Sequence, residues 1–188
     1  MNDPRSDDDL MLAYARGDVR AFEMLYERYR QPLYRYLYHS VGDRAVADDL
    51  YQDVWSRIID ARSRFRKGAG FKRYVFRVAH NRLVDHWRSR TRQGQEESVD
   101  QLALAAPAHH QPDAASEQDQ QRQQLQEALM AISTEQREAF LLQQEAGLSL
   151  ADIADHSGVG RETVKSRLRY AVKRLRGLLS PNPEAAEP

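Results

Sequence analysis

Hydrophobic residues recur at intervals of three and four along most of this chain, which is the spacing of amphipathic α-helices. The pattern is densest between residues 71 and 92, where apolar and basic side chains fall on opposite sides. The apolar side consists of Phe71, Tyr74, Val75, Val78, Ala79, Leu83, His86 and Trp87. The polar side consists of Lys72, Arg73, Arg77, Asn81, Arg82 and Arg88. We expect the first side to pack against a core and the second to face a polyanion.

Three more helices are expected before this one. The spacing predicts a helix from about residue 9 to Gly17, a long helix over residues 19–41 and a third over residues 44–59. Pro32 predicts a kink or a break near Gln31 in the long helix, because proline lacks the amide hydrogen that the helix ladder needs. Residues 61–70 have two glycines and no apolar period, so we expect a basic loop with Phe65 exposed or half buried.

The composition changes abruptly after Arg92. The following residues are rich in Gln, Ala and acids, and they include Pro107 and Pro112, which indicates a flexible linker. We therefore predict an all-α protein of two small helical domains. The predicted boundaries are 1–95 for the first domain, 96–116 for the linker, 117–180 for the second domain and 181–188 for a disordered tail.

The second domain has the pattern of a helix-turn-helix. Ser133 with Gln136, and Ser149 with Asp152, have the spacing of capping boxes. Gly158 falls where the turn between two crossing helices calls for a positive φ angle. The positions expected to pack between these helices are Ile153, Ala154, Val159, Val164 and Leu168. A structural helical hairpin is the alternative interpretation.

Positive charge is concentrated in one part of a chain that is neutral as a whole. Residues 62–92 contain eleven basic residues and one acid, Asp85, whereas the 188-residue protein has no formal net charge. Aromatic residues Tyr74, Phe76 and Trp87 lie among these cations. Cations that follow phosphates, together with rings that stack on bases, are typical of single-stranded nucleic acid binding. The alternative is an ordinary solvated basic face.

The helix over residues 44–59 has the opposite charge, with Asp48, Asp49 and Asp53 on its polar side. This side fits either a protein partner with a basic surface or plain solvation. Catalytic or magnesium-binding carboxylates are disfavoured, because neither a second carboxylate cluster nor a phosphate-binding glycine loop accompanies them. The chain has no cysteine, and its six histidines lack metal-ligand spacing, so we expect no catalytic residues, metal or cofactor.

The amino terminus is acidic where a secretory signal would be basic and then apolar. The sequence also has no apolar run near the roughly 20 residues that span a bilayer. We therefore expect a cytoplasmic protein that does not bind membranes.

The order of these motifs resembles the extracytoplasmic-function (ECF) sigma factors, group 4 of the bacterial sigma-70 family. The resemblance to regions 2.1, 2.2, 2.3–2.4 and 4.1–4.2 rests, in that order, on AFEMLYERYRQPLYRYLYHSVGD, AVADDLYQDVWSRII, FKRYVFRVAHNRLVDHWRSR and TEQREAFLLQQEAGLSLADIADHSGVGRETVKSRLRYAVKRLR. It covers nearly the whole chain. It implies a non-enzymatic factor that directs RNA polymerase to promoters and helps to melt the DNA.

The resemblance also implies a role for each surface. Residues matching the part that docks on the clamp helices of the largest subunit of core RNA polymerase are Asp48, Asp49, Gln52, Asp53 and Trp55. Residues matching the part that captures unpaired non-template bases of the minus-10 element are Arg64, Phe65, Lys67, Phe71, Lys72, Tyr74, Arg77, Asn81, Arg82 and Arg88. Residues matching the reader of the minus-35 duplex are Arg161, Glu162, Thr163, Lys165, Ser166, Arg167, Arg169 and Tyr170.

One position departs from the family pattern. Many relatives carry Trp-Leu in the melting helix, whereas this chain has Tyr74-Val75, whose ring offers less area for stacking. The sequence leaves open whether an anti-sigma factor binds the protein. The alternative function is a helix-turn-helix regulator that acts without polymerase, and a nucleic-acid enzyme that uses the aspartates is a weaker rival.

Overall fold

The computed structural model describes residues 4–68, 70–92 and 117–180. The side chains of Thr91 and Arg92 are not among the described parts. The predicted linker, 96–116, and the predicted tail, 181–188, lie outside the described residues.

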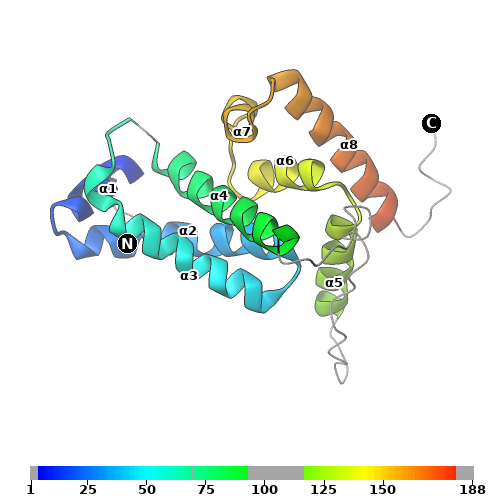
Figure 1. Cartoon of the computed structure of the whole chain (residues 1–188), viewed down its shortest axis with the longest axis horizontal. Coiled ribbons are helices and arrows are strands. Elements are labelled where there is room, and N and C mark those ends of the chain that lie inside the picture. The colour runs from blue at the N-terminus through cyan, green and yellow to red at the C-terminus, as the bar shows by residue number, and fades with distance from the viewer. Residues whose placement is uncertain (1–3, 69, 93–116, 181–188) are drawn as a thin grey trace.

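Every regular element in the described ranges is a helix, so the prediction of an all-α fold is confirmed. Figure 1 shows two groups of helices. The second group, α5–α8, is drawn mainly above and to the right of α4. The first group consists of α1 (Asp7–Ala15), α2 (Val19–Val41), α3 (Arg44–Asp60), the 3₁₀ turn η1 (Arg62–Arg64) and α4 (Phe71–Arg92). The second consists of α5 (Glu117–Met130), α6 (Thr134–Gln144), α7 (Leu150–Ser157) and α8 (Arg161–Leu179).

Short polar side chains set the beginnings of the first three helices. Ser6, Asp18 and Asp43 each accept a hydrogen bond from an amide in the first turn that follows them. Helix α2 then runs through Pro32 without ending, so the predicted break near Gln31 does not occur. Completely buried leucines on both sides of the proline hold the two halves of α2 on one core.

Helix α4 buries much of its predicted apolar side and also Phe76, which lies outside that side. Its inward residues are Phe71, Val75, Phe76, Ala79 and Leu83, each at most 1% exposed. Phe76 meets Tyr36 of α2 edge to face, with ring centroids 5.5 Å apart. The grouping of Phe76 with the binding aromatics was therefore wrong, because its ring lies in the core.

The second group contains a helix-turn-helix formed by α7 and α8, as the sequence predicts. Ser149 and Asp152 form the expected capping box at the start of α7. Gly158 ends α7 in the left-handed region, with φ of 65°. Ile153 of α7 and Val164 of α8 are completely buried between the helices.

The two groups also pack on each other. Helix α2 lies against α5 and α6, and Arg35 of α2 pairs with Glu145 at 2.6 Å. Helix α4 contributes two further ion-pair contacts, Arg73 with Asp152 at 3.4 Å and His80 with Glu138 at 2.7 Å. In each contact the first group supplies the basic residue and the second supplies the acid.

The helix-turn-helix geometry depends on the backbone of Gly158. We expect Gly158→Ala to lower the free energy of unfolding by about 1–2 kcal/mol, because a Cβ disfavours the left-handed region. An added Cβ would meet nothing within 4 Å there, so a steric clash does not contribute. Urea unfolding measures the change.

The matched control is Gly177→Ala, which lies inside α8 and also has open space around an added Cβ. That variant is expected to gain up to about 1 kcal/mol, because alanine favours a helix over glycine. Equal stability of the two variants would contradict the assignment of strain to Gly158.

Candidate nucleic-acid interface

A groove of about 820 Å³ lies between the end of α3, the turn η1 and the outer side of α4. Its rim is rich in guanidinium groups and also presents one amide side chain, Asn81, and two half-buried rings, Tyr74 and His80. The lining residues are Arg57, Asp60, Ala61, Arg64, Tyr74, Val78, His80, Asn81, Arg82, Val84, Asp85 and Arg88. Five of the predicted minus-10 residues, namely Arg64, Tyr74, Asn81, Arg82 and Arg88, are thus brought together.

A chain of ion pairs shapes one wall of the groove. The Arg82 guanidinium contacts the Asp53 carboxylate and also donates to Asp85 at 2.7 Å. The same Asp53 pairs with Arg57, one turn along α3, at 3.2 Å. These carboxylates hold Arg82 and Arg57 in place, while Arg64 and Arg88 extend into solvent.

Two predicted minus-10 residues are core residues in the structure. Phe65 is 8% exposed and Phe71 is 1% exposed, so the expectation that Phe65 is exposed or half buried is wrong. The Phe65 ring packs edge to face on Phe71 and on Tyr74, with centroids 6.1 and 5.6 Å apart. Phe65 and Phe71 therefore pack in the core under the loop, and of these three rings Tyr74 is the one that lines the groove.

The remaining predicted residues of this set, Lys67, Lys72 and Arg77, are exposed but do not line the groove. Burial raises the pKa of the Tyr74 hydroxyl, so this side chain stays neutral at physiological pH. A neutral, half-buried ring beside several cations is suited to stack on a base while the cations contact phosphates.

The acidic side of α3 is smaller than the sequence indicates. Asp49 and Gln52 are exposed, whereas Asp53 is turned toward Arg57 and Arg82. Asp48 is half buried; burial and a hydrogen bond with Asp48 raise the pKa of the Tyr34 hydroxyl. Outward acidic charge on this side therefore comes mainly from Asp49.

Trp55 lies in the core and not on the acidic side. It is 5% exposed, and its indole ring packs against Phe22 and Tyr26 with centroids 5.7 and 5.1 Å away. The tryptophan therefore fixes α3 on α2, and its ring is not available on the surface of the protein.

The predicted duplex reader forms one face of α8. Val164, Leu168, Ala171 and Leu175 are buried on the other face, at helical spacing. The side chains left outward are Arg161, Glu162, Thr163, Lys165, Arg169 and Tyr170, with Ser166 and Arg167 half buried. The Arg169 guanidinium lies over the Tyr170 ring, 5.1 Å from its centroid. Such a helix face matches the size and polarity of the DNA major groove.

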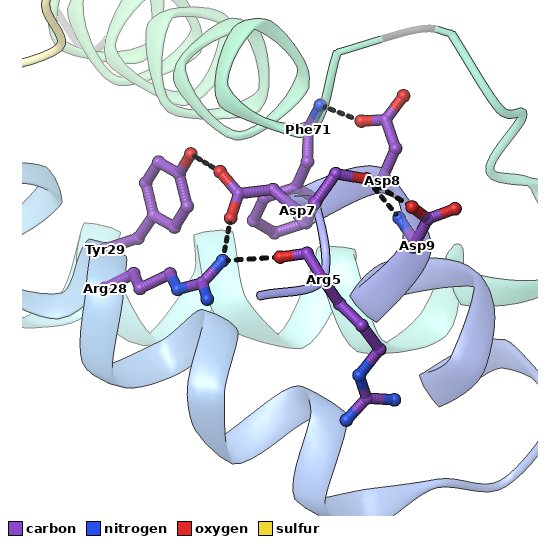
Figure 2. A network of polar contacts seen from close by, with 8 residues as sticks. Arg5, Asp7, Asp8, Asp9, Arg28, Tyr29 and Phe71 are labelled. Carbon is purple, nitrogen blue, oxygen red and sulfur yellow. Dashed lines mark hydrogen bonds and ion pairs between the residues drawn. The ribbon is translucent and has the colours of Figure 1, made fainter. Parts of the chain in front are cut away.

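An acidic network at the amino terminus was not predicted as part of any site. Figure 2 shows Asp7 directed toward Arg28 and Tyr29, and Asp8 directed toward the backbone amide of Phe71. The last contact joins residues 63 positions apart. The run of three aspartates was the only signal in the sequence, and it does not identify the partners.

The described residues show neither a cluster suited to a metal ion nor a helix suited to a membrane. These residues contain no group of three or more His, Cys, Asp or Glu side chains arranged to hold a metal ion. No helix within the same ranges is both long and apolar enough to cross a membrane.

Two family profiles match the chain, one on each group of helices. Sigma-70 region 2 matches residues 25–93, and Sigma-70, region 4 matches residues 122–175. The first match contains α3 and α4, and the second contains the helix-turn-helix. Together the matches cover more than half of the chain.

Individual relatives narrow the class. The chain is 31% identical to the ECF RNA polymerase sigma factor SigM of Mycobacterium tuberculosis, over 93% of this chain and 85% of that protein. It is 28% identical to the ECF RNA polymerase sigma factor BldN of Streptomyces coelicolor, over 87% of this chain but only 62% of that protein.

A solved structure gives the same result for the fold. The sigma factor RpoE of Bartonella quintana, crystallised with the anti-sigma factor NepR, has a TM-score of 0.71 and is 27% identical. The similarity covers 86% of this chain and 98% of that chain. The protein therefore belongs to the sigma-70 family, within its ECF group.

The contact between the two groups of helices includes a histidine whose protonation opposes folding. Burial lowers the pKa of His156, and its neighbours are His80 and Arg77 of α4 and Glu138 of α6. The unfolded chain takes up a proton on this histidine below about 6.5, whereas the folded form resists it, so stability falls as the pH drops from about 6.5 toward the lowered pKa of the folded form.

We therefore expect the melting temperature to fall more steeply between pH 7.5 and 5.5 in the wild type than in His156→Gln. Both proteins retain His80 and Glu138, so the difference isolates His156. Thermal unfolding followed by circular dichroism at both pH values measures it, and parallel pH profiles would contradict the assignment.

Proposed function

We propose that this sigma factor directs core RNA polymerase to promoters through three separate surfaces. The outward side of α3 docks on the clamp helices of the largest subunit. The exposed face of α8 reads the minus-35 duplex, and the groove beside α4 captures unpaired non-template bases of the minus-10 element. The observation that carries the proposal is the groove, because it combines a half-buried ring, an amide and several guanidinium groups on one domain.

Base capture supplies the free energy for melting in this mechanism. Unstacking a base costs a few kcal/mol, whereas stacking on a protein ring returns about 1–3 kcal/mol for each base. Tyr74 offers such a ring, and Arg64 and Arg88 add phosphate contacts at the same groove. Several small gains acting together can hold a short bubble open without any chemical reaction, so we propose a non-enzymatic factor.

An anti-sigma factor is a third class of partner in this proposal. The similar RpoE protein of Bartonella quintana was crystallised with one. The acidic and basic surfaces described above would be the target of such a partner, because both are needed by the proposed transcription complex.

A regulator that binds DNA without polymerase is the alternative, and the matches to both sigma regions do not favour it. The two functions differ in what the isolated protein does. The sigma mechanism gives weak duplex binding that becomes strong with core enzyme, whereas the alternative gives tight binding by the protein alone. A mobility-shift assay with and without core polymerase separates them.

Run-off transcription tests the proposed function directly. Purified core polymerase with this protein is expected to give discrete transcripts from a subset of genomic fragments, because only matched promoters are melted. Core polymerase alone serves as the control. An identical set of transcripts in both reactions would overturn the proposal.

Charge reversal tests the docking surface. We expect Asp49→Lys together with Asp48→Lys to weaken binding to core polymerase about tenfold or more, since like charges placed together across an interface cost several kcal/mol. Asp53 is left unchanged, because its carboxylate holds Arg57 and Arg82 in the groove. Fluorescence anisotropy of labelled protein measures the affinity.

The control for this change is Glu23→Lys, an exposed acid on α2. It is expected to retain most of the affinity, which separates a local contact from a general effect of charge. Unchanged affinity in the double variant would remove α3 from the proposed interface.

A further inference from the structure

The carboxylate of Asp8 accepts three backbone hydrogen bonds from a distant part of the chain. One oxygen accepts from the Gly68 amide at 2.8 Å and from the Gly70 amide at 3.3 Å. The other accepts from the Phe71 amide at 2.7 Å, as Figure 2 shows. A single side chain of α1 therefore holds the last residues of the loop that leads into α4.

These three amides form a site that favours a negatively charged group. The first amides of a helix have no partner within the helix, and the positive end of the helix dipole favours a negative charge there. Gly68 and Gly70 have φ of 85° and 76°, in the left-handed region that glycine adopts readily. Asp8 thus caps α4 from another helix.

Helix α1 holds Asp8 firmly. Leu10 and Met11, directly after the aspartates, are completely buried. On the other side of Asp8, Asp7 pairs with Arg28 at 2.5 Å and accepts a hydrogen bond from Tyr29 (Figure 2). The capping carboxylate therefore belongs to a helix that is packed into the core.

The loop that Asp8 holds carries part of the groove. Arg64 lines the groove at the beginning of the loop, and Phe65 anchors that end in the core. At the other end, Lys67 pairs with Asp9 at 3.0 Å, immediately before the amides that Asp8 binds. The core fixes the first half of this glycine-containing loop, and the aspartates of α1 fix the second half.

We propose that Asp8 is a positioning residue for minus-10 recognition, an inference that rests on the proposed function. Asp8 holds Gly68, Gly70 and the first turn of α4 in the arrangement that captures bases. A loop already ordered before binding loses less conformational entropy when DNA binds, and it places its side chains more accurately for discrimination between bases. Without the carboxylate, two glycines with positive φ would leave the loop free to sample other conformations.

The first test measures the order of the loop in the full chain without DNA. Amide hydrogen exchange of Gly68, Gly70 and Phe71 is expected to be about tenfold faster or more in Asp8→Ala than in the wild type, which is the loss expected for hydrogen bonds to a charged group. Asp18→Ala is the control, because it removes the capping carboxylate of α2 and does not touch the loop. Equal exchange in both variants would overturn the proposal.

The second test measures recognition by the holoenzyme. The probe is a fork-junction DNA with an unpaired minus-10 strand, taken from a promoter that the wild-type holoenzyme transcribes. Asp8→Ala is expected to bind it about tenfold more weakly and to discriminate less between the matched strand and strands with single-base changes. Binding to a minus-35 duplex probe is expected to be unchanged, and Asp18→Ala is expected to behave as the wild type on both probes.

Further outcomes distinguish misfolding of the variant, failure of the positioning role and failure of the proposed function. Asp8→Asn keeps the shape and one acceptor oxygen, so it carries the same tests, with smaller effects, if Asp8→Ala does not fold. Wild-type discrimination in an Asp8 variant whose loop exchanges faster would overturn the positioning role and leave only a structural cap. Failure of the wild-type holoenzyme to transcribe any promoter would overturn the proposed function and, with it, the role of Asp8 in recognition, whereas the exchange result would stand.

Discussion

The deep burial of α4 is the constraint on which the rest of the structure depends. A helix with many like charges on one side is favourable only if burial of its other side offsets their repulsion and the cost of ordering long side chains. Phe71, Val75, Phe76, Ala79 and Leu83 provide that burial. With the helix fixed in this way, Asn81 and Arg88 remain outward and available to a ligand.

The sequence predicted the helices well, because their apolar spacing and their caps are local properties. The capping box at Ser149 and the left-handed Gly158 could be predicted from a few neighbouring residues. The side chains of Phe65 and Phe76 could not be placed in the same way. They are buried by contacts between helices, and a hydrophobic pattern along one helix does not show how many other elements cover it.

Charged residues show the same limit more clearly. Spacing placed Asp48, Asp49 and Asp53 together on one side of α3. In the structure, however, Asp53 pairs with Arg82 of α4, and Asp48 lies beside Tyr34 of α2. Asp8 is the extreme case, because its partners are 60 to 63 residues away. Coulombic and hydrogen-bonding partners depend on tertiary distance, so the sign of a surface was predictable and its partners were not.

His80 connects the two groups of helices with the groove. Its ring lines the groove, pairs with Glu138 at 2.7 Å and lies 5.9 Å from the ring of His156. A change in the packing of α6 and α7 on α4 would therefore move one wall of the groove. Arg64 and Arg88 lie elsewhere on the groove, on elements of the first group alone. The packing of the second group thus bears on the groove through His80, whereas all of the lining residues, including the arginines, belong to the first group.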